Sequence, residues 1–196
     1  ALEHSSVGGA LSALQQQGYE VDLVDIGRDG KIDLEHLAEL LRRDTVLVSV
    51  CAVDSELGTV QPIREIASLL KDYPSCRLHV DATQAVGKTE LALEGADTMS
   101  IAPHKFYGLN GSGLLVKRKE LVIEPQIHGG GSTTPYRSGT PALGLAVSIE
   151  KALRLALENQ EQRIAHVKAL NCRLRTELAK YPAVRINSPE TAVPHI

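Results

Sequence analysis

The sequence predicts an α/β domain in which a mostly parallel sheet is flanked by helices. Short apolar, β-branched runs alternate with segments whose apolar residues recur every three or four positions. The run at 46–53 is largely apolar, which is typical of a strand buried on both faces of a parallel sheet. We predict strands at 19–26, 46–53, 77–80, 97–101, 113–117 and 184–186.

Helical periodicity marks the segments between these strands. A first helix is predicted over 4–17, with Gly18 as its stop. Asp33 is placed to cap a helix that runs to Arg43, and Pro62 stands in the first turn of another. Helical spacing then dominates from 141 to about 180.

Composition excludes several functional classes. The 196 residues fit one domain, and 43% apolar with 23% charged residues is an ordinary globular balance. Net charge is −3 with both signs scattered, which gives no support for nucleic-acid binding. No apolar run approaches the roughly 20 residues of a membrane span. Three widely spaced cysteines form no metal or disulfide motif, which favours a reducing, cytoplasmic compartment.

Two ionisable residues follow neighbouring strands. Asp81 closes one short apolar run, and Lys105 follows another. Carboxyl ends of strands are where open α/β sheets place their ligands. An amine and a carboxylate there suit an aromatic aldehyde cofactor, which forms a Schiff base with lysine and pairs its ring nitrogen with an acid. An exposed lysine and a turn-forming or helix-capping acid are the simpler alternatives.

Three motifs resemble one family. HVDATQAVGK at 79–88, SIAPHKFYG at 100–108 and GGGSTTPYRSGT at 129–140 are similar to those of cysteine desulfurases. These enzymes belong to the aminotransferase class V group, which depends on pyridoxal phosphate (PLP). The resemblance runs from Glu3 to Ile196. It implies the large domain of the aspartate aminotransferase-like fold, known as fold type I. It also implies conversion of L-cysteine to L-alanine, with sulfur left as an enzyme persulfide for iron–sulfur clusters or tRNA thiolation.

The resemblance assigns roles around the cofactor ring. Lys105 holds PLP and acts as acid and base, and Asp81 keeps the ring nitrogen protonated. Gln84 forms a hydrogen bond with the ring hydroxyl. His4 stacks on the ring and assists proton transfer, although a polar residue ahead of a helix is the plainer interpretation.

Further residues are expected at the cofactor's periphery. His104 and Ser100 are placed near the phosphate, and Thr140 is implied to reach the partner's phosphate across a homodimer. Two positions depart from the family. Ala102 replaces a hydroxyl residue, and Asp54 replaces an asparagine that donates toward the cofactor hydroxyl or the substrate carboxylate. The histidines match no metal-ligand spacing, so no metal site is predicted.

The resemblance also predicts what the sequence lacks. We interpret 1–140 as a large PLP-binding domain truncated at its N-terminus, and 141–196 as a helical region leading to a mostly missing small domain. The persulfide cysteine and the arginine for the substrate carboxylate are expected beyond the last residue. Cys51, Cys76 and Cys172 are therefore not assigned the persulfide role, and the fragment alone is expected to be inactive.

Other functions stay open at this point. A selenocysteine lyase or another class V aminotransferase would share the same motifs. A degenerate, non-catalytic paralogue that serves as a binding or assembly partner is supported only by Asp54 and Ala102. The expected partners are L-cysteine, a second copy of the chain, and a sulfur-acceptor or scaffold protein. The sequence does not identify that acceptor.

Overall fold

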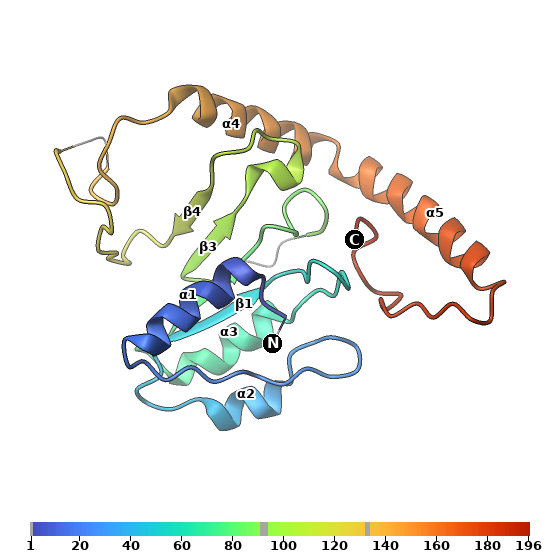
Figure 1. Cartoon of the computed structure of the whole chain (residues 1–196), viewed down its shortest axis with the longest axis horizontal. Coiled ribbons are helices and arrows are strands. Elements are labelled where there is room, and N and C mark those ends of the chain that lie inside the picture. Colours follow the sequence, from blue (N-terminus) through green and yellow to red (C-terminus); the bar gives the residue numbers. More distant parts are fainter. Residues whose placement is uncertain (1, 91–93, 132–133) are drawn as a thin grey trace.

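The computed structural model of this chain describes residues 2–90, 94–131 and 134–196. Within them a four-stranded sheet has the strand order β1–β2–β3–β4 (Figure 1). The strands are β1 (Leu47–Cys51), β2 (Arg77–Asp81), β3 (Thr98–Ile101) and β4 (Leu114–Lys117). The first three run parallel and β4 is antiparallel to β3, which confirms an α/β fold with a mostly parallel sheet.

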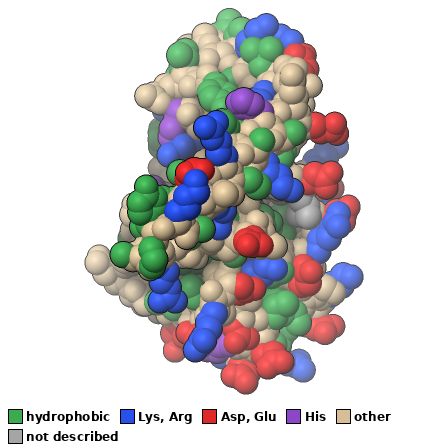
Figure 2. Space-filling model, turned by 90° about the vertical axis from the view of Figure 1, so that its right-hand side faces the viewer, with side chains coloured by type: hydrophobic (Ala, Val, Ile, Leu, Met, Phe, Trp, Pro, Cys, Tyr) green, Lys and Arg blue, Asp and Glu red, His purple; other side chains and the backbone are tan. Residues whose placement is uncertain are grey.

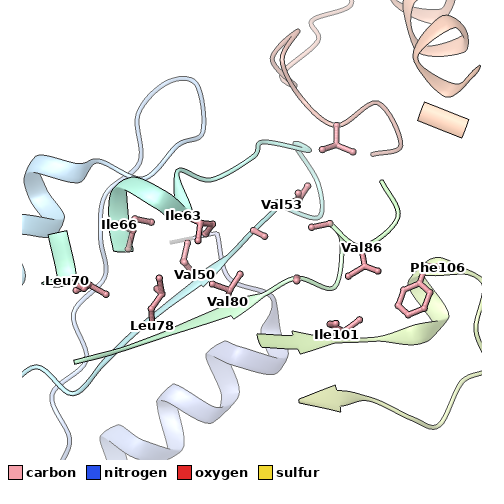
Figure 3. Close-up of a cluster of buried hydrophobic side chains, with 14 of the residues drawn as sticks. Val50, Val53, Ile63, Ile66, Leu70, Leu78, Val80, Val86, Ile101 and Phe106 are labelled. Atoms are coloured by element: carbon pink, nitrogen blue, oxygen red, sulfur yellow. The ribbon is translucent and has the colours of Figure 1, made fainter. Parts of the chain in front are cut away.

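Helices flank this sheet. Their bounds are α1 (Ser5–Gln16), α2 (Leu34–Leu40), α3 (Ile63–Leu69), the 3₁₀ turns η1 (Leu70–Asp72) and η2 (Pro103–Phe106), α4 (Leu143–Glu158) and α5 (Gln160–Leu178). In Figure 3, α3 lies on one face of the sheet and α1 on the other. No helix in the described ranges is long and apolar enough to cross a membrane.

The core lies between α3 and one face of the sheet. Val50, Leu78 and Val80 alternate with polar neighbours along β1 and β2 and point toward Ile63 and Ile66 of α3 (Figure 3). All five are almost fully buried. Burying one such side chain stabilises the fold by about 1.5–3 kcal/mol. This apolar face leaves the opposite face of the same strands free for polar side chains.

The start of α2 was predicted correctly and its end was not. The Asp33 carboxylate accepts hydrogen bonds from the backbone N–H groups of Glu35 (3.0 Å) and His36 (3.1 Å), as an N-cap does. The helix stops at Leu40 rather than at Arg43, because Leu41 already has extended backbone angles.

The strand predicted at 19–26 is wrong. Ile26 forms an isolated bridge with Ile32, and within the described residues no strand pairs with this segment. A cleft of about 590 Å³, lined by Val24 and Leu47 among others, lies between the segment and β1. An apolar pattern alone does not make a strand without a neighbour to share its hydrogen bonds.

The run at 46–53, which was predicted to be buried on both faces, is more exposed than expected where it borders this cleft. β1 is the first strand of the sheet, and Val46 and Leu47 are exposed, so only the end of this run is fully buried.

The last predicted strand, 184–186, is wrong as well. The Val184 N–H closes a turn onto the Tyr181 carbonyl (2.9 Å), and α5 has by then carried the chain away from the sheet (Figure 1).

The helical region that begins at 141 first packs on the sheet domain. Ala152 and Ala156 of α4 are buried in the same core as η2. After α5 the chain turns back, and the Val193 N–H donates to the Gly58 carbonyl at 2.8 Å. The boundary at 140 between a large and a small domain stays a prediction.

The surface carries both signs of charge. On the face shown in Figure 2, basic and acidic side chains are intermixed, in keeping with a net charge of −3. This face therefore offers no continuous basic surface for a polyanion.

Candidate active site

Three predicted site residues lie at one edge of the sheet. Asp54 follows β1, Asp81 ends β2, and Lys105 lies in η2, directly after β3. Because these strands are parallel, their carboxyl ends meet at the same edge. Asp81 and Lys105 thus follow strands, as the sequence predicted. The chemical role of all three residues stays a prediction.

Asp81 is a buried acid with little to neutralise it. Only 9% of the residue is exposed, and its Oδ1 accepts one hydrogen bond, from the Thr83 N–H at 2.9 Å. It forms no ion pair with any residue in 2–90, 94–131 or 134–196. A buried carboxylate is costly unless it is paired. This arrangement suits a ligand that brings its own cationic N–H.

The loop that presents Lys105 is fixed by its neighbours. Phe106 is buried, whereas His104 and Lys105 are exposed. Tyr107 takes a left-handed conformation (φ 71°), and the Gly108 N–H closes the turn onto the Pro103 carbonyl at 2.9 Å. A Cβ at Gly108 would lie 2.8 Å from the Pro103 Cβ, so this close approach requires glycine. The lysine thus projects from a constrained turn toward solvent.

Gln84 lies in the turn after β2, where the ammonium of Lys88 donates to its Oε1. Burial, with the charge of Lys105, lowers the pKa of Lys88. No role was predicted for Lys88 from the sequence, although it closes the motif at 79–88 and lies four residues after Gln84.

His4 has a structural task in this chain. It is the N-cap of α1, and its Nδ1 accepts a hydrogen bond from the Ser6 N–H at 3.2 Å.

The neighbouring Glu3 is half-buried, and burial together with the charge of Asp81 raises its pKa. Glu3 therefore lies close to Asp81, a placement that was not predicted from the sequence.

Asp54 helps to build its own turn. Its Oδ1 accepts hydrogen bonds from the N–H groups of Glu56 (3.1 Å) and Leu57 (2.5 Å), and the residue is 4% exposed. An asparagine Oδ1 would accept the same two bonds, so nothing in this turn explains the departure from asparagine. Contact with a ligand would have to use the other oxygen.

Ser100 lies beside Asp81 in register, and its hydroxyl is 3.2 Å from His79 Nε2. The Nδ1 of His79 is 2.8 Å from the Thr98 hydroxyl. Burial lowers the pKa of His79, which favours the neutral imidazole. His79 was not expected to bind a metal, and its link between β2 and β3 was not predicted from the sequence. The structure shows no cluster of three or more metal-ligand side chains in the ranges it describes.

Cys51 is a core residue. Its Sγ lies 3.6 Å from the Leu2 carbonyl oxygen, and burial, with Glu3 and the two aspartates nearby, raises its pKa to about 12. Such a thiol stays protonated and unreactive at neutral pH.

Within the described residues, no hydrogen bond or ion pair joins Thr140 to Lys105. Thr140 is exposed, and the Arg137 guanidinium donates to the nearby Ser138 carbonyl at 2.9 Å. Two residues of the motif, Ser132 and Thr133, lie outside the described part of the chain. The sequence-based expectation for Thr140 therefore depends on a second subunit.

Comparison with known proteins identifies the family. The sequence profile described as "Aminotransferase class-V" matches residues 1–195. The chain belongs to the aminotransferase class-V family. Enzymes of this family depend on PLP, which agrees with the cofactor expected from the sequence.

Curated relatives are named as NifS/IcsS homologues or cysteine desulfurases. A NifS/IcsS protein homologue of Lactobacillus delbrueckii subsp. bulgaricus is 36% identical over 201 residues, covering 100% of this chain and 52% of its own length. The cysteine desulfurase IscS of Colwellia psychrerythraea is 40% identical over 189 residues, covering 94% and 46%. The class-V chain thus spans about half the length of the curated relatives it matches.

Solved structures agree with the fold. A NifS-like protein superposes with a TM-score of 0.94 at 34% identity, covering 98% of this chain and 54% of that one. DndA from Streptomyces lividans superposes with a TM-score of 0.88 at 32% identity, covering 98% and 56%. The arrangement of strands around the candidate site is therefore that of NifS-like enzymes.

Proposed function

We propose that this class-V chain forms the cofactor-binding part of a PLP-dependent cysteine desulfurase that converts L-cysteine to L-alanine. One observation carries the proposal: the buried Asp81 carboxylate has no ion-pair partner in the described ranges and ends the strand next to the one that leads to Lys105. The cysteine desulfurase name of the relative at 40% identity supports the choice of substrate.

The residues fit PLP on chemical grounds. When bound, PLP supplies an electron sink for negative charge at the substrate's α-carbon. Asp81 would hold a proton on the ring nitrogen, and Gln84 would donate to the ring hydroxyl. Lys105 would bind the cofactor and move a proton at the α-carbon, because its amine is the one presented by η2 at this edge. His4 would stack on the ring and assist proton transfer.

Within the described residues, fewer side chains are candidates for binding the phosphate of PLP than for binding its ring. His104 and Ser100 are its candidates, although the Ser100 hydroxyl already lies 3.2 Å from His79. Ala102 contributes no hydroxyl. We propose that Thr140 completes the contact from a second subunit, since within the described residues no hydrogen bond joins Thr140 to Lys105. On this proposal the active enzyme is a homodimer.

The activity belongs to a longer protein. We propose that a C-terminal half of the kind found in its relatives supplies the persulfide cysteine and the carboxylate-binding arginine. The sulfur would pass to an acceptor or scaffold protein for iron–sulfur cluster assembly in the cytoplasm. The 196-residue chain alone is expected to bind PLP weakly and to release no alanine.

The test is alanine release from L-cysteine by the full-length enzyme, with Lys105→Ala and the 196-residue chain as controls. We expect alanine only from the unaltered full-length protein. Selenocysteine is offered in parallel, and exclusive turnover of selenocysteine would replace the desulfurase with a lyase. Alanine release by Lys105→Ala at the unaltered rate would contradict the proposed site.

A further inference from the structure

A second lysine approaches the candidate cofactor site. The Lys88 ammonium donates to Gln84 Oε1, four residues earlier in the turn after β2. An ammonium group can only donate hydrogen bonds, so it selects the oxygen end of the Gln84 amide. The NH₂ end must therefore point elsewhere. It donates to no other protein group in the described part of the chain.

The turn that carries both residues is held firmly. The Ala85 N–H donates to the Ala82 carbonyl at 3.0 Å, and the Lys88 N–H donates to the Ala85 carbonyl at 3.1 Å. A Cβ at Gly87 would lie 3.0 Å from the Ala156 Cβ, so the turn lies directly against α4. The spacing between Lys88 and Gln84 is consequently set by the backbone and not by a mobile loop.

Lys88 also differs from an ordinary surface lysine. It is half-buried, and the Lys105 charge acts on it. Placing an ammonium group in such a position is unfavourable unless it gains a specific bond. The bond it gains is the one to Gln84, which indicates that the interaction is built into the turn.

We propose that Lys88 is a positioning residue for Gln84: by holding Oε1, it directs the Gln84 NH₂ group toward the hydroxyl of the PLP ring. This inference rests on the proposed PLP site. Lys88 then needs no contact with the cofactor, because its whole effect passes through the glutamine. Without it, the amide can rotate and present its oxygen to the ring hydroxyl, which weakens the contact.

The test compares Lys88→Met, Gln84→Ala and the double variant in the full-length protein, by PLP titration and by the visible absorbance spectrum of the loaded enzyme. We expect Lys88→Met to weaken PLP binding about three- to tenfold, the range of one hydrogen bond, and to shift the cofactor band. In the Gln84→Ala background, Lys88→Met should change neither quantity further. Lys71→Met removes the same side chain from an exposed position in η1, and its PLP affinity and absorbance spectrum should match those of the unaltered protein.

Lys88→Arg keeps a side chain that can only donate hydrogen bonds. Its affinity for PLP should therefore stay within about twofold of that of the unaltered protein. Lys88→Leu provides a second variant without the donor if Lys88→Met fails to fold. The inference is overturned if the variant without the donor leaves both readouts unchanged, or if it weakens PLP binding equally in the Gln84→Ala background. Neither readout requires turnover of cysteine. A protein that binds PLP but releases no alanine would refute the desulfurase proposal and leave this inference standing.

Discussion

The turns after β1 and β2 begin with similar residues and have different consequences. Asp54 and Asp81 are both buried, at 4% and 9% exposure. Two backbone N–H groups donate to Asp54 Oδ1, whereas Asp81 Oδ1 receives one. Asp81 accepts one backbone bond fewer through Oδ1 than Asp54 does, which leaves more of its carboxylate for a ligand such as a cationic ring nitrogen.

The largest expected effect is that of Asp81→Asn. An amide cannot stabilise a protonated ring nitrogen, so turnover of cysteine by the full-length enzyme should fall at least about 100-fold. Stability without cofactor should be unchanged or slightly higher, because an unpaired buried charge has been removed. Rates and urea denaturation measure the two quantities. Turnover within about threefold of the unaltered enzyme would remove Asp81 from the site.

Two glycines, one in each turn, allow a second comparison of the turns. Gly58 and Gly87 both have left-handed φ angles, 72° and 73°, and a Cβ at either would meet a neighbour at 3.0 Å. Substitution by alanine should therefore cost about 1–3 kcal/mol of stability at each. Only Gly87→Ala should also weaken PLP binding, because it displaces the turn of Gln84. Equal losses of PLP affinity in both variants would contradict a functional difference between the turns.

Asp54→Ala should have a smaller effect, on stability alone. Losing the acceptor of two backbone N–H groups costs about 0.5–2 kcal/mol, as at a helix cap. Asp54→Asn keeps an oxygen at the same place and should restore most of that stability. Thermal or urea unfolding compares the pair. If the two variants were equally destabilised, the bonds to Glu56 and Leu57 would not be what holds the turn.

The smallest effect concerns pH. Burial lowers the pKa of His79, so just below its ordinary pKa the unfolded chain binds more protons than the folded chain. The free energy of unfolding should therefore fall as pH drops from about 7 to 5. His79→Gln should make this decline shallower, as urea titrations at several pH values would show. An unchanged slope would mean that His79 titrates alike in both states.

The sequence predicted which residues lie at this edge of the sheet because the pattern that places them is local. An acid or a lysine after an apolar run needs only the rule that parallel strands end together, and Asp81 and Lys105 follow it. The errors at 19–26 and 184–186 have the opposite cause. Those runs have strand-like composition, but a strand also requires a neighbour, which is not encoded locally. The bonds of Asp54, Lys88 and His79 were missed for a similar reason, since side-chain partners depend on the folded geometry.

The most direct test of the account is to locate the cofactor's covalent attachment. The full-length enzyme is loaded with PLP, reduced with borohydride, digested and mapped by mass spectrometry. The account predicts a pyridoxyl adduct on Lys105, lost in Lys105→Ala and greatly reduced in occupancy in Asp81→Asn at limiting PLP. An adduct on Lys88 or Lys117 instead, with Lys105 unmodified, would contradict it.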